Sequence, residues 1–378
     1  MHDLISPSYI KLTHHTSLVL VLNSLISSVA SFGIQPELLS SHSKQCRQNF
    51  EELGLNPIKP FEAFSGYYLL NRRAIDYRFH GSEMICYLNG THLLCIKNKG
   101  YSSGHIPWEK ARRSIFLRFI VDFLTFVKGS FHLLTLPPII FRTTSSDVGI
   151  PSKPSAHVCL HATGLDFTLC QGTIVLPVHF NQLVGRMSVY VKDAAKIGSW
   201  KQKREVACWR GNNNPPHPSS LRNRLVRIAE KVSFIDAAFG EYSWSNLTSC
   251  KVIIAVDGYG YFSHVIKRAL LSGSVVARVA HESGNGEWFE PFLIPYYNFV
   301  PIRSDLSDLE SVVRWIINND KAAHTIAQNA YLTFRQLFNA RMMSCYGLLS
   351  LDFWSSRQVV DFNATDLFFK ESDTVDKL

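Results

Sequence analysis

Three short apolar segments in the second half of the chain decide its fold class. They read VACW at 206–209, VIIAV at 252–256 and SVVARV at 274–279. Runs of this length that are rich in Val and Ile are typical of buried strands. A helix is predicted over 219–231, followed by a further short strand at 232–235, and a second helix is predicted up to Leu271. This alternation predicts a parallel sheet with helices on both faces, whose ligands bind at the carboxyl ends of the strands.

Further elements are predicted on either side of these units. Downstream, two helices are expected over 308–317 and 321–338, the second with an apolar face. Upstream, apolar residues at steps of three and four predict a core-packing helix over 108–127, and strands are expected at 133–141 and 173–177.

A hairpin is predicted where MICYLNGTHLLCI at 84–96 places Asn89-Gly90 between two apolar runs. In a two-residue turn Cys95 lies opposite Met84. A Cys86–Cys95 disulfide would then need a shifted register, so we do not predict this bond.

Composition excludes several function classes. The 378 residues are 46% hydrophobic and 18% charged, which excludes disorder as the main state. The net charge is +9, but the sequence has no basic stripe with interleaved aromatic residues, so we expect no nucleic-acid partner. The eight cysteines include no C-x-x-C pair, and no metal site is predicted.

The N-terminal stretch 17–34 is uncharged around LVLVL at 18–22. Its small residues at 28–30 suit a signal peptide, while its length suits an anchor or an ordinary buried helix. These alternatives stay open, so residues 1–35 are treated as a signal peptide or an anchor, and only an anchor would bring membrane contact.

Three polar or aromatic groups follow the strands of the second half. Arg210 and Gly211 end the first strand, and an arginine fork suits phosphate or sugar hydroxyls. A glycine-rich turn at 257–263 then leads into a helix whose free N–H groups suit an anion. Aromatic and acidic residues at 287–301 can stack on and bind a sugar. Taken singly, Arg210 fits a structural role equally well, and the glycine-rich turn is more often a mere tight turn. The aromatic segment fits packing between domains at least as well.

In combination, these blocks resemble glycosyltransferase family 90, which includes the protein O-glucosyltransferases of the endoplasmic reticulum and fungal capsule xylosyltransferases. The matching blocks are W-R-G at 209–211, V-D-G-x-G at 256–260, G-S-V-V at 273–276, E-W at 287–288, the proline-bounded 295–301 and D-L-S-D-L at 305–309. The likeness runs from about 200 to 350.

The resemblance implies an α/β fold of the GT-B type, with two Rossmann-like domains facing across a cleft. It implies a UDP-sugar donor, glucose or xylose, transferred with inversion to a hydroxyl of a protein or glycan acceptor. No D-x-D carboxylate pair is present. We therefore expect no metal or other cofactor, with cations and helix N-termini balancing the diphosphate. The expected donor-binding residues are Trp209, Arg210, Gly211, Asp257, Gly258, Gly260, Ser263, Lys267, Arg268, Glu287 and Trp288.

The general base implied by the resemblance is an aspartate that follows a strand of the N-terminal domain. Here Thr143 follows Arg142, and Asp147 is the nearest acid, so Asp147 is the predicted catalytic base. Two further departures are Val265 in place of an arginine and Asn298 in place of a histidine. Val265 and the displaced aspartate motivate a competing hypothesis, a carbohydrate- or nucleotide-binding protein of the same fold that has lost turnover.

The resemblance also orders the chain into domains. We expect an N-terminal acceptor-side domain over 36–195, a nucleotide-sugar-binding domain over 196–345, and a C-terminal helix with an acidic tail over 346–378. Cys250 and Cys345 fall at positions like those of the family, with Cys46 as the candidate partner of Cys345. These cysteine positions fit an oxidising lumen, that of the endoplasmic reticulum or Golgi. The sequons at Asn89, Asn246 and Asn363 can accept glycans only in the secretory pathway, and about this many are expected by chance.

Overall fold

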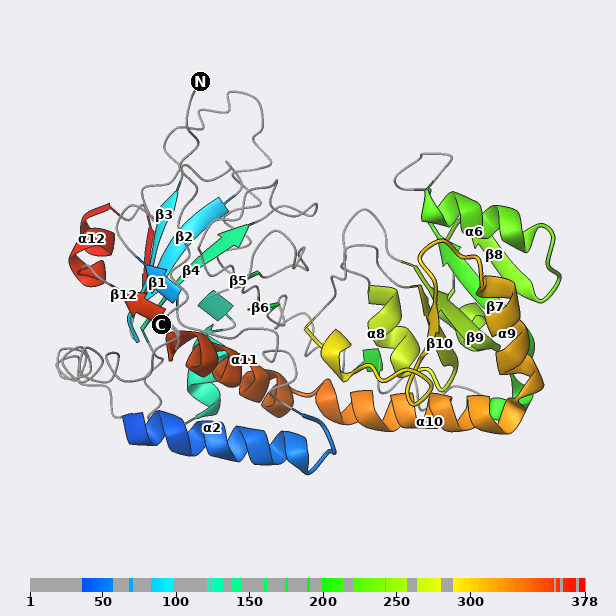
Figure 1. Cartoon of the computed structure of the whole chain (residues 1–378), viewed down its shortest axis with the longest axis horizontal. Helices are drawn as coiled ribbons and strands as arrows, with labels where there is room; N and C mark the ends of the chain where they lie inside the picture. Colours follow the sequence, from blue (N-terminus) through cyan, green and yellow to red (C-terminus); the bar gives the residue numbers. More distant parts are fainter. Residues whose placement is uncertain are drawn as a thin grey trace, which may run out of the picture.

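The structure is a computed structural model in which the chain forms two lobes (Figure 1). Figure 1 places the strands β7 to β10 in one lobe and β1 to β6 in the other, with α10 and α11 running between them. The residues that the structure describes are 36–56, 68–70, 83–90, 92–97, 121–122, 124–131, 138–144, 160–161, 174–175, 189–190, 199–213, 220–241, 243–256, 264–279, 288–356, 358–360, 363–371 and 374–377.

The C-terminal lobe contains a five-stranded parallel sheet in the order β11-β10-β9-β7-β8. This sheet confirms the predicted α/β class. Its strands are β7 (Arg204–Gly211), β8 (Ile235–Phe239), β9 (Cys250–Ala255), β10 (Val275–Val279) and β11 (Val300–Ile302). The helices of this lobe are α6 (Leu221–Ala229), α7 (Trp244–Thr248), α8 (His264–Leu270), α9 (Leu309–Asn318) and α10 (Asp320–Leu337), with short 3-10 turns η3 (Trp200–Gln202) and η4 (Glu290–Phe292).

Helices cover both faces of this sheet, because strand residues alternate between two apolar cores. Ala207 and Ile254 belong to the core formed with α6, α9 and the first half of α10. Ile253 and Val276 belong to the core formed with α8 and the second half of α10. Successive side chains along a strand point to opposite faces of the sheet, so neighbouring residues enter different cores.

The N-terminal lobe is built around an antiparallel four-stranded sheet in the order β13-β3-β2-β4. Two Rossmann-like domains were expected. In the described part of the chain, the C-terminal lobe has a parallel sheet of more than two strands and the N-terminal lobe does not. The last residues of the chain return to this lobe, where β12 pairs with β1 and β13 with β3. Its elements are α2 (Pro36–Glu51), β1 (Tyr68–Leu70), β2 (Glu83–Leu88), β3 (His92–Lys97), β4 (Ile139–Thr144), β5 (Leu160–His161), β6 (Ile174–Val175), α11 (Ala340–Ser355), β12 (Gln358–Val360), α12 (Ala364–Glu371) and β13 (Thr374–Lys377).

The predicted hairpin is present as β2 and β3, but its register differs from the expected one. Leu88 pairs with Leu93 and β3 begins at His92, so three residues lie between the strands and not two. Cys86 therefore lies opposite Cys95, and the two form a disulfide with a Cα–Cα distance of 4.1 Å. Our expectation against this bond was wrong because it assumed the shortest turn.

A second disulfide, Cys46–Cys345, joins α2 to α11 and confirms the pairing suggested for Cys345. Both cysteines belong to an apolar core that includes residues of both lobes. In this core, Phe50 of α2 stacks on Phe292 of η4, with ring centroids 5.5 Å apart. The helix expected over 108–127 is seen in part, since 121–122 and 124–130 are helical and the residues before 121 lie outside the described ones. None of the described helices has the length and apolar character needed to cross a membrane.

A buried lysine fixes the amino ends of the C-terminal sheet. Lys203 is 6% exposed, and its Nζ donates to the carbonyl oxygens of Thr248 and Ser272 and to the hydroxyl of Ser274. None of these acceptors is charged. Burial therefore lowers the pKa of Lys203 to about 8.

We expect this lysine to make stability rise with pH. The folded chain releases the Lys203 proton near pH 8, whereas the unfolded chain holds it to its ordinary pKa of 10.5. Between these values the unfolded state binds more protons, so the free energy of unfolding increases, by roughly 3 kcal/mol over the whole window. Urea titrations of the wild type and Lys203→Met across this window measure the difference, with Lys201→Met as the exposed control. If the difference in free energy of unfolding between the wild type and Lys203→Met stays constant with pH, the lowered pKa of Lys203 is contradicted.

Candidate functional site

Six of the predicted site residues lie in the described part of the chain. They are Trp209, Arg210, Gly211, Lys267, Arg268 and Trp288. The other six, Asp147, Asp257, Gly258, Gly260, Ser263 and Glu287, lie outside the described residues. The structure therefore tests the surroundings of the first group only.

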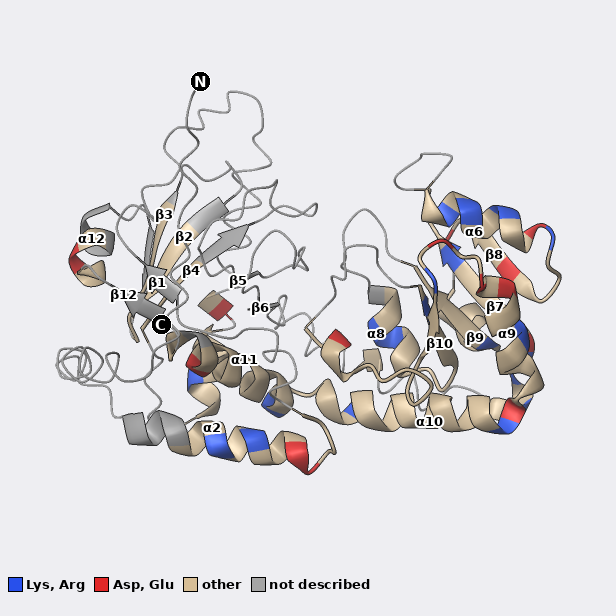
Figure 2. Cartoon of the chain, viewed as in Figure 1, with Lys and Arg blue, Asp and Glu red and all other residues tan. Residues whose placement is uncertain are grey.

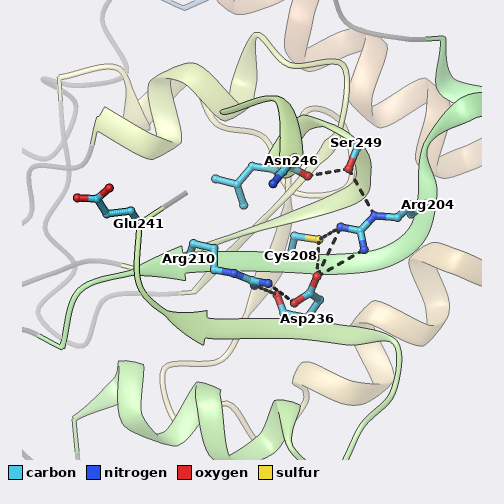
Figure 3. Close-up of a pocket in the computed structure, with 8 residues that line it drawn as sticks. Arg204, Cys208, Arg210, Asp236, Glu241, Asn246 and Ser249 are labelled. Atoms are coloured by element: carbon cyan, nitrogen blue, oxygen red, sulfur yellow. Dashed lines mark hydrogen bonds and ion pairs between the residues drawn. The ribbon is translucent and has the colours of Figure 1, made fainter. Parts of the chain in front are cut away.

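Arg210 lies at the carboxyl end of β7, as predicted, and is held by the neighbouring strand β8 (Figure 3). Its Nη2 forms an ion pair with Asp236 Oδ1 at 2.5 Å. Its Nη1 donates to the backbone oxygens of Asp236 and Trp209, at 2.7 and 2.8 Å. The guanidinium is thus fixed in place while its side chain keeps 29% exposure.

A polar pocket of about 340 Å³ opens beside this ion pair. Asp236 is the central group, because it also contacts Arg204, at 3.5 Å. Figure 3 shows Glu241 at one end of the pocket and Arg204 at the other, with Arg210 and Asp236 between them. The lining residues are Arg204, Cys208, Arg210, Asp236, Glu241, Asn246, Leu247 and Ser249.

A third disulfide forms part of the pocket wall. Cys208 of β7 is bonded to Cys250 of β9, with a Cα–Cα distance of 6.1 Å. Arg204 Nη2 lies 3.1 Å from the Cys250 sulfur and 3.4 Å from that of Cys208. The disulfide therefore holds β7 and β9 together beside the contact between Arg204 and Asp236.

Trp209 has a packing role in the structure. Its side chain is 3% exposed, and its ring contacts Phe239 edge-on at 5.9 Å in the core beneath α6. Gly211 lies against the same ring, where a Cβ at position 211 would come within 2.7 Å of Trp209 Cζ2. The W-R-G motif thus combines a core residue, a surface cation and a close backbone approach.

Gly211→Ala is expected to destabilise the C-terminal lobe by roughly 1–3 kcal/mol, because the buried indole has no room to move away from the new methyl group. Gly129→Ala is the matched control, since a Cβ at Gly129 meets no atom within 4 Å. Chemical unfolding of both variants gives the comparison. Equal stability of the two would show that the contact at Gly211 relaxes without cost.

The described cations of α8 are engaged within the protein. Lys267 is fully buried, and the Arg268 guanidinium lies over the rings of Trp244 and Tyr190, at 4.2 and 5.0 Å. Trp288 is likewise 2% exposed and packs against Tyr346 and Phe338. Of the described predicted residues, Arg210 is the one whose charged side chain lines the pocket.

The charged groups that line the pocket are two arginines and two acids. Figure 2 shows further basic residues along α6 and on α8 in the C-terminal lobe, but these do not line the pocket. Within the pocket, Arg204 and Arg210 donate hydrogen bonds, while Asp236 and Glu241 can accept them. Such alternation of donors and acceptors fits hydroxyl groups as well as an anion.

Comparisons with known proteins show what this lobe is similar to. Residues 180–364 match the model of the family described as glycosyl transferase family 90. This segment is therefore similar to glycosyl transferase family 90. The match covers the parallel sheet, the W-R-G strand and α10.

Relatives that match part of this chain include protein O-glucosyltransferases. Human protein O-glucosyltransferase 1 is 26% identical over 196 residues, which are 46% of this chain and 48% of that protein. Rat protein O-glucosyltransferase 3 is 29% identical over 177 residues, which are 43% of this chain and 34% of that protein. The alignments thus cover at most about half of these relatives.

Two solved structures also match in part. Anabaena Alr3699/HepE in complex with UDP has a TM-score of 0.28 at 16% identity, covering 41% of this chain and 42% of that one. Sucrose-phosphate synthase from Thermosynechococcus elongatus has the same TM-score and identity, covering 47% of this chain and 44% of that one.

Sequence reasoning missed the partner of Arg210. The strand expected at 232–235 ends before Asp236, whereas β8 starts at Ile235 and pairs Cys208 with Asp236. The signal was the single polar residue Asp236 between Ile235 and Ala237, which places its side chain on the face of the sheet opposite theirs. The Cys208–Cys250 bond was also missed.

Proposed function

We propose that the chain is a glycosyltransferase that moves glucose or xylose from a UDP-sugar to a hydroxyl of a protein or glycan acceptor, with inversion and without a metal. The observation that carries this proposal is the family 90 match over the lobe with the parallel sheet. Relatives named protein O-glucosyltransferases support both the reaction class and a protein acceptor.

The donor is proposed to bind at the carboxyl ends of the parallel strands. The carboxyl ends of β9 and β10 lie at the same sheet edge as the end of β7, because all three strands are parallel. Asp257, Gly258, Gly260, Ser263 and Glu287 follow these strands in the sequence. Arg210, held by Asp236, supplies a fixed positive charge at this edge.

The proposed chemistry needs a base on the acceptor side. Asp147 would take the proton of the acceptor hydroxyl as the new bond to the anomeric carbon forms and UDP leaves from the opposite face. Asp147 lies three residues beyond the end of β4. Positive charge near Arg210 would stabilise the departing diphosphate.

The cellular location follows from the same proposal. We propose the lumen of the endoplasmic reticulum or Golgi, with three disulfides in the described part of the chain as support. The competing candidate is a binding protein of the same fold that lacks turnover. Val265 and the packing of Arg268 between two aromatic rings favour that candidate.

Transfer of radiolabelled sugar from UDP-glucose or UDP-xylose to peptide and glycan hydroxyls, with a chelator present, tests this function. We expect transfer from at least one donor and a product of inverted anomeric configuration by NMR. Retained configuration would contradict the inverting mechanism, and loss of activity in chelator would contradict metal independence. UDP binding without transfer would favour the binding protein.

A further inference from the structure

One asparagine is placed as a site of covalent modification. We propose that Asn246, in the sequon Asn246-Leu247-Thr248, is an N-glycosylation acceptor that carries its glycan beside the polar pocket. This proposal rests on the secretory location proposed above. The sequence alone does not separate Asn246 from the sequons at Asn89 and Asn363, but the structure does.

The side chains of the other two sequon asparagines hold local structure. Asn363 caps α12, since its Oδ1 accepts from the backbone N–H of Asp366 and its Nδ2 donates to that carboxylate at 2.6 Å. Asn89 stabilises the β2–β3 connection, where its Oδ1 accepts from the backbone N–H of His92 at 2.8 Å. A glycan at either position must be accommodated around these bonds.

Asn246 has the opposite character. It is exposed on α7, and within the described part of the chain its side-chain amide makes no hydrogen bond. Its contacts are made by the backbone, whose N–H donates to Ser243 Oγ and whose oxygen accepts from Ser249 Oγ. A sugar on Nδ2 therefore displaces no side-chain bond of the folded protein.

The threonine of this sequon sets when the sugar must be added. Thr248 is 5% exposed, and its hydroxyl donates to the backbone oxygens of Trp244 and Ser245. The folded helix thus hides the hydroxyl that completes the sequon. Cys250 follows two residues later and is bonded to Cys208. Addition must therefore precede the folding of α7 and the closing of this disulfide.

The reaction is a nitrogen glycosylation by a lipid-diphosphate-linked oligosaccharide. The Asn246 amide nitrogen forms a bond to the anomeric carbon of the first sugar, the anomeric carbon–oxygen bond breaks, and the lipid diphosphate leaves. The amide gives one proton to a base of the transferase. No electron transfer is involved.

The position of Asn246 keeps the glycan away from the far end of the pocket. Figure 3 shows Asn246 and Ser249 toward the Arg204 end, whereas Glu241 lies at the opposite end. A glycan that begins at Asn246 would cover α7 and the Arg204 end. The Glu241 end and the adjoining carboxyl end of β7 would remain open.

The experiment expresses the full chain behind a heterologous cleavable signal peptide in cultured animal cells. Peptide mass spectrometry after N-glycosidase digestion in heavy-oxygen water marks each occupied asparagine as an aspartate carrying the label. We expect most molecules to be labelled at Asn246. Asn246→Gln should lose the mass of one glycan, whereas Thr248→Ser, which keeps the sequon, and Asn363→Gln should keep the Asn246 glycan.

An unmodified Asn246 in secreted protein that contains the Cys208–Cys250 disulfide would overturn the proposal, because the chain would have passed the modifying enzyme and folded without a glycan. The added signal peptide supplies entry to the pathway. Failure here is therefore distinct from failure of the proposed location. It is also distinct from failure of the proposed transferase activity, which is measured with deglycosylated protein.

Discussion

Asp147→Asn is expected to lower the rate of sugar transfer by about 10² to 10⁴-fold and to leave UDP binding nearly unchanged. The amide has the size of the carboxyl group but does not take the proton of the acceptor hydroxyl. Because Asp147 is assigned to the acceptor side, after β4, its charge should contribute little to holding UDP. Turnover at saturating donor and acceptor, together with calorimetric UDP binding, measures the two effects separately.

Asp122, another acid of the N-terminal lobe, provides the control as Asp122→Asn, and we expect wild-type turnover from it. Full activity in Asp147→Asn would place the base at another residue. Equal losses of turnover and of UDP affinity would instead indicate a structural role for Asp147.

The second large effect is expected at Arg210. Arg210→Ala should weaken UDP binding by about 1.5 to 3 kcal/mol, or roughly 10 to 150-fold in Kd, through loss of charge-assisted bonds to the donor. Arg210→Lys should recover only part of the affinity, because an ammonium group lacks the planar fork that also pairs with Asp236.

The same site offers matched controls for Arg210. Arg204→Ala removes the other cation in contact with Asp236, and Arg227→Ala removes a cation of α6 that does not line the pocket. We expect Arg227→Ala to bind UDP like the wild type. We expect Arg204→Ala to bind UDP more tightly than Arg210→Ala does. Unchanged affinity in a folded Arg210→Ala protein would remove Arg210 from the donor site.

The fold of the C-terminal lobe could be predicted because its signals are local. The segment at 252–256 is apolar without interruption, and the one at 274–279 is apolar apart from Ser274 and Arg278, as is typical of strands buried on both faces. Both segments form strands in the structure. The apolar face expected on the helix at 321–338 is also buried in α10. In contrast, the Cys86–Cys95 bond depends on the length of one turn, which the Asn89-Gly90 pair did not determine.

The site could be predicted less completely, because it depends on which face of a strand each side chain occupies. Trp209 and Arg210 are adjacent in sequence, yet Trp209 enters the core and Arg210 reaches the pocket. Trp288 was expected to contact a ligand and is buried among aromatic rings. Asp236 was missed because a strand boundary misplaced by a few residues hides its pairing with β7.

The central claim is that the C-terminal lobe binds a UDP-sugar and that the whole chain turns it over. The most direct test is UDP release from a panel of UDP-sugars with chelator present, alongside UDP binding by calorimetry. The account predicts saturable UDP binding and release of UDP from UDP-glucose or UDP-xylose in preference to the other sugars. Absence of UDP binding by the folded protein would contradict it.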